Sequence, residues 1–249
     1  MNKEKILVVD DDESVVEYLQ TALELAQYDV RSDTSSSKAL ALLRSTPGGF
    51  PVILSDIMMP EMDGLEMLRI IRKEFPETLV VMLTAHASME SAIRALNEGA
   101  FAYLRKPVDL GELKASIKNA FEKYHLVQEN KRLVEELNKA KEYTETIVQN
   151  LVYTVVATDS DGYIRKINRA MENILGYKEE ELVGKPLDII FSEEFRRTSW
   201  TDLISKRYVK DFAVIFRTKD GRAVEASFSG TIMKNDHGQM LGFLGTAVV

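Results

Sequence analysis

Short apolar runs alternate with longer amphipathic stretches through the first half of the chain. The runs have the composition of buried strands, and the stretches between them space their apolar residues three and four apart, as helices do. The predicted strands are Ile6–Val9, Asp29–Arg31, Val52–Leu54, Leu79–Leu83 and Phe101–Leu104, and the predicted helices are Val15–Leu25, Lys38–Leu43, Leu65–Ile71 and Ile93–Leu96. Because strands that alternate with helices favour right-handed crossovers, this half is predicted to be an α/β domain with a five-stranded, doubly wound parallel sheet.

A long helix is predicted next. Asp109 can cap its first turn, and no Gly or Pro interrupts the chain from Glu112 to Asp161. Positions four and three apart then repeat in the heptad pattern of a coiled coil. The predicted seam consists of Leu126, Asn130, Leu133, Leu137, Ala140, Thr144, Ile147 and Leu151. Since a buried Asn in such a seam favours two parallel helices, we expect a parallel homodimer; the alternative is a solvated linker helix that docks on its own domain.

The pattern changes again in the second half, where strands are separated by Gly-containing turns. The predicted strands are Tyr153–Thr158, Gly162–Ile167, Lys210–Arg217, Ala223–Thr231 and Leu241–Val249, with short helices at Arg169–Leu175 and within residues 179–206. Strands, then helices, then long hairpins favour an α+β domain with a five-stranded antiparallel sheet and helices on one face. We therefore expect an α/β domain at residues 1–123, a helical coiled-coil linker at 124–147 and the α+β domain at 148–249.

Composition excludes several kinds of protein. The 39 acidic and 32 basic residues give a net charge of -7, which argues against a chain that wraps nucleic acid. The absence of cysteine excludes disulfides, a thiolate nucleophile, Cys-ligated zinc and a flavin-cysteinyl adduct. No signal peptide and no apolar run of about 18 residues is present, so we expect a cytoplasmic segment without a membrane span.

Polar residues end the predicted parallel strands. Asp10 and Asp11 follow the first strand, Asp56 the third, Thr84 the fourth and Lys106 the fifth. These strand ends meet at one edge of a doubly wound sheet. Clustered carboxylates repel one another unless a cation neutralises them, and oxygen ligands of this kind suit Mg²⁺. Each residue alone is an ordinary cap or loop residue, but together they predict a site where a carboxylate takes up a phosphoryl group.

Four segments carry a resemblance to a known family: Ile6–Asp12, Ser55–Gly64, Leu83–His86 and Tyr103–Pro107. Together they resemble the signature of a two-component response-regulator receiver domain. The resemblance implies that Asp56 accepts a phosphoryl group from a histidine kinase or phosphotransfer protein.

The same resemblance implies a role for each residue around Asp56. Mg²⁺ would be bound by Asp11, Asp56 and the backbone carbonyl of Met58, with Asp10 assisting through water. Lys106 would pair with phosphoryl oxygens, and the peptide bond before Pro107 would be cis. The residues expected to switch on phosphorylation are Thr84 and Tyr103, and the residue expected to line the entrance is His86.

An ordered set of motifs in the second half resembles a PAS domain: Asp159–Ile164, Ile167–Ala170, Ile174–Tyr177, Glu181–Pro186, Lys219–Gly221 and Gly242–Gly245. The missing cysteine excludes a flavin-cysteinyl adduct, and the absence of His between His125 and His237 disfavours haem. The ligand stays unknown. The apolar residues that would line a pocket or simply fill the core are Ile174, Leu175, Ile189, Phe191, Phe216, Phe228 and Phe243.

These resemblances predict a phosphorelay module that accepts phosphate, loses it by its own chemistry and signals through the helix to the PAS domain. One alternative is a haloacid-dehalogenase-like phosphatase with Asp10 as nucleophile and Asp12 as acid, but Pro107–Asp109 lacks the later acidic pair which that family needs. Another is a stand-alone interaction module that responds to phosphorylation. We expect a longer protein beyond Val249, a sensor histidine kinase first, with a cyclase or transcription regulator as alternatives.

Overall fold

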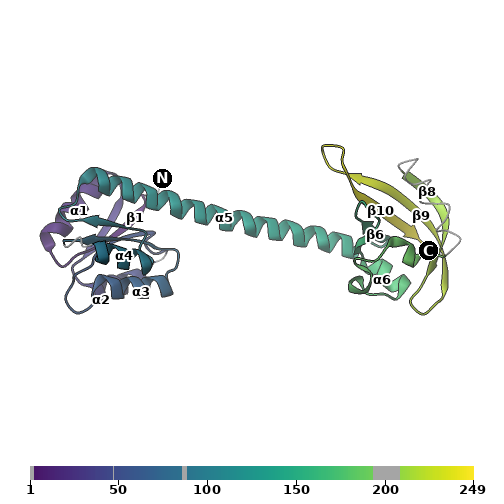
Figure 1. The fold of residues 1–249 in the computed structure, drawn as a ribbon, viewed down its shortest axis with the longest axis horizontal. Coiled ribbons are helices and arrows are strands. Elements are labelled where there is room, and N and C mark those ends of the chain that lie inside the picture. Colours follow the sequence, from purple (N-terminus) through teal and green to yellow (C-terminus); the bar gives the residue numbers. More distant parts are fainter. Residues whose placement is uncertain (1–2, 47, 86–88, 193–207) are drawn as a thin grey trace. The chain divides into compact units, whose positions relative to one another are not determined.

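The computed structural model describes residues 3–46, 48–85, 89–192 and 208–249 (Figure 1). The chain divides into two compact units, Met1–Val134 and Glu135–Val249. Both predicted fold classes are confirmed, since the first unit has a parallel sheet and the second an antiparallel sheet. His86 and residues 193–206, half of the stretch 179–206 in which short helices are predicted, lie outside the described residues.

The first unit is a five-stranded parallel sheet with the strand order β2-β1-β3-β4-β5. Its strands are β1 (Lys5–Val9), β2 (Asp29–Asp33), β3 (Val52–Asp56), β4 (Leu79–Thr84) and β5 (Ala102–Arg105). Its helices are α1 (Glu13–Leu25), α2 (Ser36–Ser45), α3 (Gly64–Glu74), α4 (Met89–Asn97) and α5 (Leu110–Asn150). Every element predicted for this half is present, most of them longer by one to a few residues.

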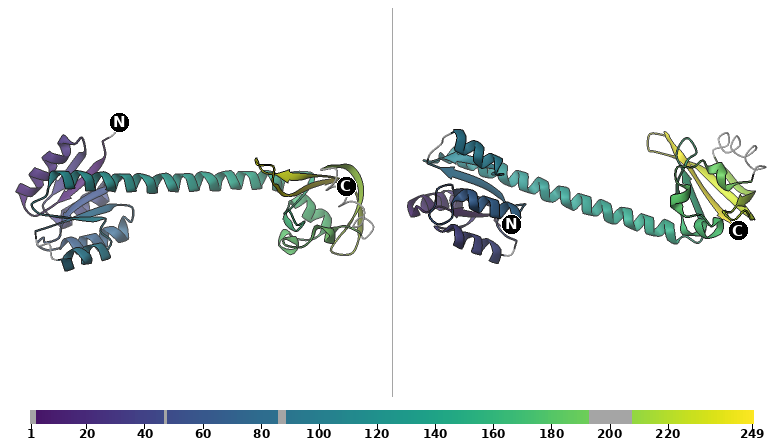
Figure 2. Two further views of the ribbon diagram at one scale, coloured as in Figure 1. Left: turned by 45° about the horizontal axis from the view of Figure 1, so that its top comes forward. Right: turned by 60° about the horizontal axis from the view of Figure 1, so that its bottom comes forward.

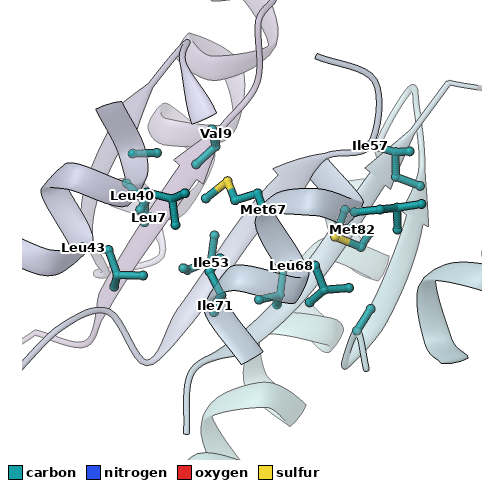
Figure 3. Close-up of a cluster of buried hydrophobic side chains, with 14 of the residues drawn as sticks. Leu7, Val9, Leu40, Leu43, Ile53, Ile57, Met67, Leu68, Ile71 and Met82 are labelled. Atoms are coloured by element: carbon teal, nitrogen blue, oxygen red, sulfur yellow. The ribbon is translucent and has the colours of Figure 1, made fainter. Parts of the chain in front are cut away.

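Helices cover both faces of this sheet. Leu7 and Val9 of β1 point into an apolar layer shared with α2 and α3, which Figure 3 shows in close-up. Ile6 and Val8 point into the opposite layer, shared with α1 and α5. Strands buried on both faces read as continuous apolar runs, which is the pattern of β1, β3 and β4. Because apolar layers cover both faces of the sheet, polar side chains can gather only at the ends of its strands.

Helix α5 begins on the first unit and continues unbroken for 41 residues (Figure 2). Asp109 caps it, because its Oδ1 accepts a hydrogen bond of 2.9 Å from Glu112 N. Only the first turns are buried, through Leu113, Ile117 and Phe121. Although α5 is long, neither it nor any other helix among the described residues is apolar enough to cross a membrane.

The second unit is a five-stranded antiparallel sheet with the order β7-β6-β10-β9-β8. Its strands are β6 (Thr154–Thr158), β7 (Ile164–Ile167), β8 (Tyr208–Arg217), β9 (Ala223–Lys234) and β10 (Met240–Val248). Helices α6 (Arg169–Leu175) and α7 (Glu179–Leu182) and a 3-10 helix (Leu187–Ile190) pack against the core side of this sheet.

Aromatic rings fill part of the core of the second unit. The ring of Phe191 lies 5.4 Å from that of Phe216 and 5.5 Å from that of Phe228, centroid to centroid. Gly245 is pressed against Phe228, since a Cβ at this glycine would lie 2.4 Å from the ring. The space between these rings is therefore occupied by side chains. Of the other predicted lining residues, Leu175 and Phe243 are buried, and Ile174 and Ile189 are partly buried.

Candidate functional site

The structure brings three carboxylates together at the carboxyl edge of the parallel sheet. Asp10 follows β1 directly, and Asp56 ends the neighbouring strand β3. One oxygen from each of Asp10, Asp11 and Asp56 lies within 4.8 Å of the others. Asp10 is fully buried, Asp56 is 6% exposed, and Asp11 is exposed to solvent. The cluster predicted from the strand ends therefore forms, with its opening on the side of Asp11.

Lys106 supplies the cation of this cluster from the loop after β5. Its Nζ lies 2.6 Å from Asp10 Oδ2 and 2.8 Å from Asp56 Oδ2. Burial lowers the pKa of Lys106, but the hydrogen bonds and charges of the two carboxylates outweigh burial and raise its pKa overall. The Lys106–Pro107 peptide is cis, as the resemblance implies. Lys106 is thus held as an ammonium group at the centre of the site.

The Asp56 carboxylate is fixed by one donor on each oxygen. Its Oδ1 accepts a hydrogen bond of 2.7 Å from Ile57 N, and its Oδ2 accepts the bond from Lys106. Both donors leave lone pairs on the carboxylate, since each oxygen can accept more than one hydrogen bond. Asp56 is therefore oriented without being fully saturated.

Asp10 fits a site for a cation. Its Oδ1 accepts a hydrogen bond of 3.1 Å from Asp12 N. Its buried Oδ2 pairs with Lys106 Nζ, and no other donor among the described residues reaches it. Burial raises the pKa of the Asp10 carboxyl, and the Lys106 ammonium offsets this only in part. Three clustered carboxylates, one of which has a buried oxygen paired with Lys106 alone among the described residues, suit a hard divalent ion such as Mg²⁺.

Replacing Asp10 with Asn should stabilise the metal-free protein. Because the folded-state pKa of Asp10 is raised, the folded state binds protons more tightly than the unfolded state, and stability falls as pH rises through that pKa. Asp10→Asn removes this cost, so at pH 7 in EDTA we expect Tm to rise by about 2–4 °C, on the order of 1 kcal/mol. The difference should vanish in acid, where wild-type Asp10 is protonated.

The matched control is Asp11→Asn, because Asp11 is exposed and its removal should leave the metal-free Tm nearly unchanged. Adding Mg²⁺ should raise the Tm of the wild type but not that of Asp10→Asn. A lower Tm for Asp10→Asn in EDTA would show that its carboxylate stabilises the fold.

Other residues of the predicted signature lie around this cluster. Asp12 caps α1, with its Oδ1 accepting hydrogen bonds from Ser14 N at 2.9 Å and Ser14 Oγ at 2.6 Å. These bonds lower the pKa of Asp12. Thr84 ends β4 and is 2% exposed, while Tyr103 packs partly buried against the layer of α2 and α3. Met58 lies two residues after Asp56, with an exposed side chain.

The residues of the predicted seam lie along α5, outside this cluster, except Leu151, which directly follows the last residue of α5, Asn150. The single chain leaves them exposed, with exposed fractions between 41% and 69% for Leu126, Leu133, Leu137, Ile147 and Leu151. Asn130 is exposed as well.

Sequence reasoning missed Ser36, whose partner lies in the loop that follows Asp56. Ser36 is 2% exposed at the start of α2, and its hydroxyl donates a hydrogen bond of 2.8 Å to the carbonyl of Met62, in the loop between Asp56 and α3. A serine at the start of a helix ordinarily indicates a cap, and the partner is 26 residues away, so no local pattern could have indicated this contact.

Two family models match the chain. The model of the response regulator receiver domain matches residues 6–118, and the model of the PAS fold matches residues 142–247. The response regulator protein PilR of Pseudomonas aeruginosa is 38% identical over 120 residues, which are 48% of this chain and 26% of PilR. The DNA-binding transcriptional regulator NtrC of Proteus hauseri is 39% identical over 124 residues, 50% of this chain and 26% of NtrC.

One solved structure, described as an adenylate cyclase from Rhodopirellula baltica, is 33% identical with a TM-score of 0.50. The match covers 54% of this chain and 98% of that chain. This chain spans only 26% of the length of the two curated relatives.

Proposed function

Since this chain carries a response regulator receiver domain at residues 6–118 followed by a PAS domain at 142–247, we propose that it relays a phosphoryl signal through Asp56. Receiver domains accept phosphate from histidine kinases, so the proposed partner is a histidine kinase or a phosphotransfer protein. The observation that carries the proposal is the position of the Asp56 carboxylate, 2.8 Å from Lys106 Nζ and clustered with Asp10 and Asp11.

In the proposed reaction an Asp56 oxygen forms a bond to phosphorus while the bond from phosphorus to the donor's imidazole nitrogen breaks. The nitrogen keeps the bonding electron pair and takes a proton from solvent. Lys106 stabilises the negative charge that gathers on the phosphoryl oxygens, and the fixed Asp56 rotamer aligns the attack. A Mg²⁺ ion held by Asp10, Asp11, Asp56 and the Met58 carbonyl would neutralise the remaining charge.

Signal transfer would begin beside the phosphoryl group. Thr84 is buried at the end of β4 and directly follows Leu83, the residue that pairs with Asp56, so we propose it as the hydroxyl donor that the resemblance implies. Tyr103 lies on the adjacent strand β5 and is partly buried, so an inward rotation of its ring would bury it further. We propose that both respond to phosphorylation and change the surface formed by α4, β5 and the start of α5.

We also propose the domain limits 1–123, 124–147 and 148–249, with the linker as a parallel coiled coil. Three side chains on one side of the helix bond the start of the linker to the receiver unit: His125 Nε2 lies 2.7 Å from Glu4 Oε1, and Gln128 and Lys131 both bond to Glu77. At 100° per residue these three positions lie on the side of the helix opposite Leu126, Asn130 and Leu133. The predicted seam therefore stays open to a second chain.

The phosphatase alternative has no observation in its favour. It needs Asp12 as a proton donor, but the Asp12 carboxylate caps α1 and its pKa is lowered by the hydrogen bonds from Ser14. It also leaves unused Asp56, which the structure places with Lys106.

The proposal is tested by labelling the intact chain with acetyl phosphate, a small phosphoryl donor. We expect one phosphoryl group per chain by intact mass spectrometry in the presence of Mg²⁺, and none when EDTA removes the metal, because Lys106 alone does not neutralise three carboxylates and the cluster then repels the anionic donor. Labelling that proceeds equally well in EDTA would contradict the metal-dependent site.

A further inference from the structure

The loop between Asp56 and α3 has a strained conformation. Glu61 has a φ of +69°, in the left-handed region that residues other than glycine seldom adopt. Around it, Met62 N donates a hydrogen bond of 2.9 Å to Pro60 O, which closes a three-residue turn of the rare γ type. Such a turn persists only where its surroundings hold it.

The two ends of this loop are held by the backbone. Gly64 N donates a hydrogen bond of 2.9 Å to Ile57 O, and the main chain at Gly64 approaches Asp56 so closely that a Cβ there would lie 1.9 Å from the Asp56 carbonyl oxygen. This close approach requires glycine at position 64. It does not by itself fix the middle of the loop, where Met58 and the strained turn lie.

Ser36 holds the middle of the loop from the start of α2. Its Oγ donates a hydrogen bond of 2.8 Å to Met62 O and lies 3.5 Å from Met59 Sδ, so it contacts both flanks of the γ turn. Capping of α2 is done by its neighbour Ser35, whose hydroxyl accepts from Lys38 N. The Ser36 hydroxyl is thus left for a bond outside its own helix, in a setting where the side chain is 2% exposed.

We propose that Ser36 is a positioning residue for the phosphoryl-transfer site. Its hydroxyl holds the turn at Pro60–Met62 through the hydrogen bond to Met62 O. Its contact with Met59, whose side chain is buried in the core, also holds the adjacent main chain at Met58. The inference rests on the proposed function, which assigns the Met58 carbonyl to the metal. Without the hydroxyl the Met62 carbonyl loses its partner and the turn can relax, so the Met58 carbonyl is no longer held in place for the ion.

The test compares Mg²⁺ affinity, measured by isothermal titration calorimetry, in the whole chain and in three variants. Ser36→Ala should weaken Mg²⁺ binding by about three- to ten-fold, as expected for the loss of one partly buried hydrogen bond. Ser36→Thr keeps the hydroxyl and should recover most of the affinity. Ser37→Ala is the matched control, because Ser37 is the next residue of α2 and is exposed.

Acetyl phosphate labelling provides a second readout. Ser36→Ala should be labelled slowly at low Mg²⁺ and at nearly the wild-type rate at saturating Mg²⁺, because the nucleophile itself is intact. If Ser36→Ala binds Mg²⁺ with wild-type affinity, even with a lowered Tm, Ser36 contributes to stability but not to metal binding, and the inference is overturned. A wild-type chain that neither binds Mg²⁺ nor takes label would instead refute the proposed function.

Discussion

Replacing Asp56 with Asn should abolish phosphoryl labelling of this chain by acetyl phosphate in the presence of Mg²⁺. The amide lacks the negative charge of the carboxylate and is a poor nucleophile, while its size and shape keep the packing at the end of β3. We expect the label to fall below detection in intact mass spectra, and peptide mapping of the wild type should place it on Asp56.

The control for this experiment is Asp12→Asn. Asp12 stands two residues from Asp10 but caps α1, and Asn is as good a cap as Asp, so the fold and labelling should be preserved to within about two-fold. Label that persists in Asp56→Asn and maps to Asp10 would contradict the receiver assignment and revive the phosphatase alternative. The pair of variants therefore separates loss of the nucleophile from general disturbance of the acidic cluster.

The acidic cluster could be predicted from the sequence because it depends on topology alone. Once β1 and β3 are parallel neighbours, Asp10 and Asp56 must end at the same edge of the sheet. The continuity of α5 was also predictable, since no Gly or Pro interrupts it after Gly111, but its end at Asn150 was not, because that stretch continues to Asp161. These features follow from local pattern and one rule of strand arrangement.

Contacts that join distant segments through a single side chain could not be predicted. Ser36 carries no pattern that distinguishes it from Ser35 and Ser37, and only the packing of α2 against the loop after β3 gives it a partner. The γ turn at Glu61 could not be predicted either, because no glycine at this position indicates the positive φ.

Strand ends were the least accurate part of the fold prediction. Strand β9 continues three residues beyond the predicted Thr231, to Lys234, since its pairing with β10 extends as far as the turn that begins at Asn235. Strand β2 likewise extends two residues beyond the predicted Arg31, because β1 pairs with it as far as Asp33. Pairing partners, which the chain does not reveal locally, decide where these strands end.

Replacing Leu137 with Asp should convert the expected dimer into a monomer. Leu137 is 69% exposed in the single chain and occupies the same heptad position as Asn130, one heptad later. In a parallel coiled coil it would pack against Leu137 of the partner, so the variant loses two buried leucines and sets two carboxylates against each other. Each leucine contributes about 2–5 kcal/mol when buried, so the dissociation constant should rise at least about 100-fold.

Size-exclusion chromatography with light scattering measures this directly, at micromolar concentrations of the whole chain. The matched control is Lys139→Asp, which introduces the same residue two positions later, at about 200° around the helix and away from the seam. It should stay dimeric, because it adds a carboxylate and the same helix propensity without touching the interface. A wild-type chain that is monomeric, or a Leu137→Asp variant that remains dimeric, would instead favour a solvated linker helix. The exposed leucines of α5 would then face water in the working protein, which costs about 1.5–3 kcal/mol each relative to burial.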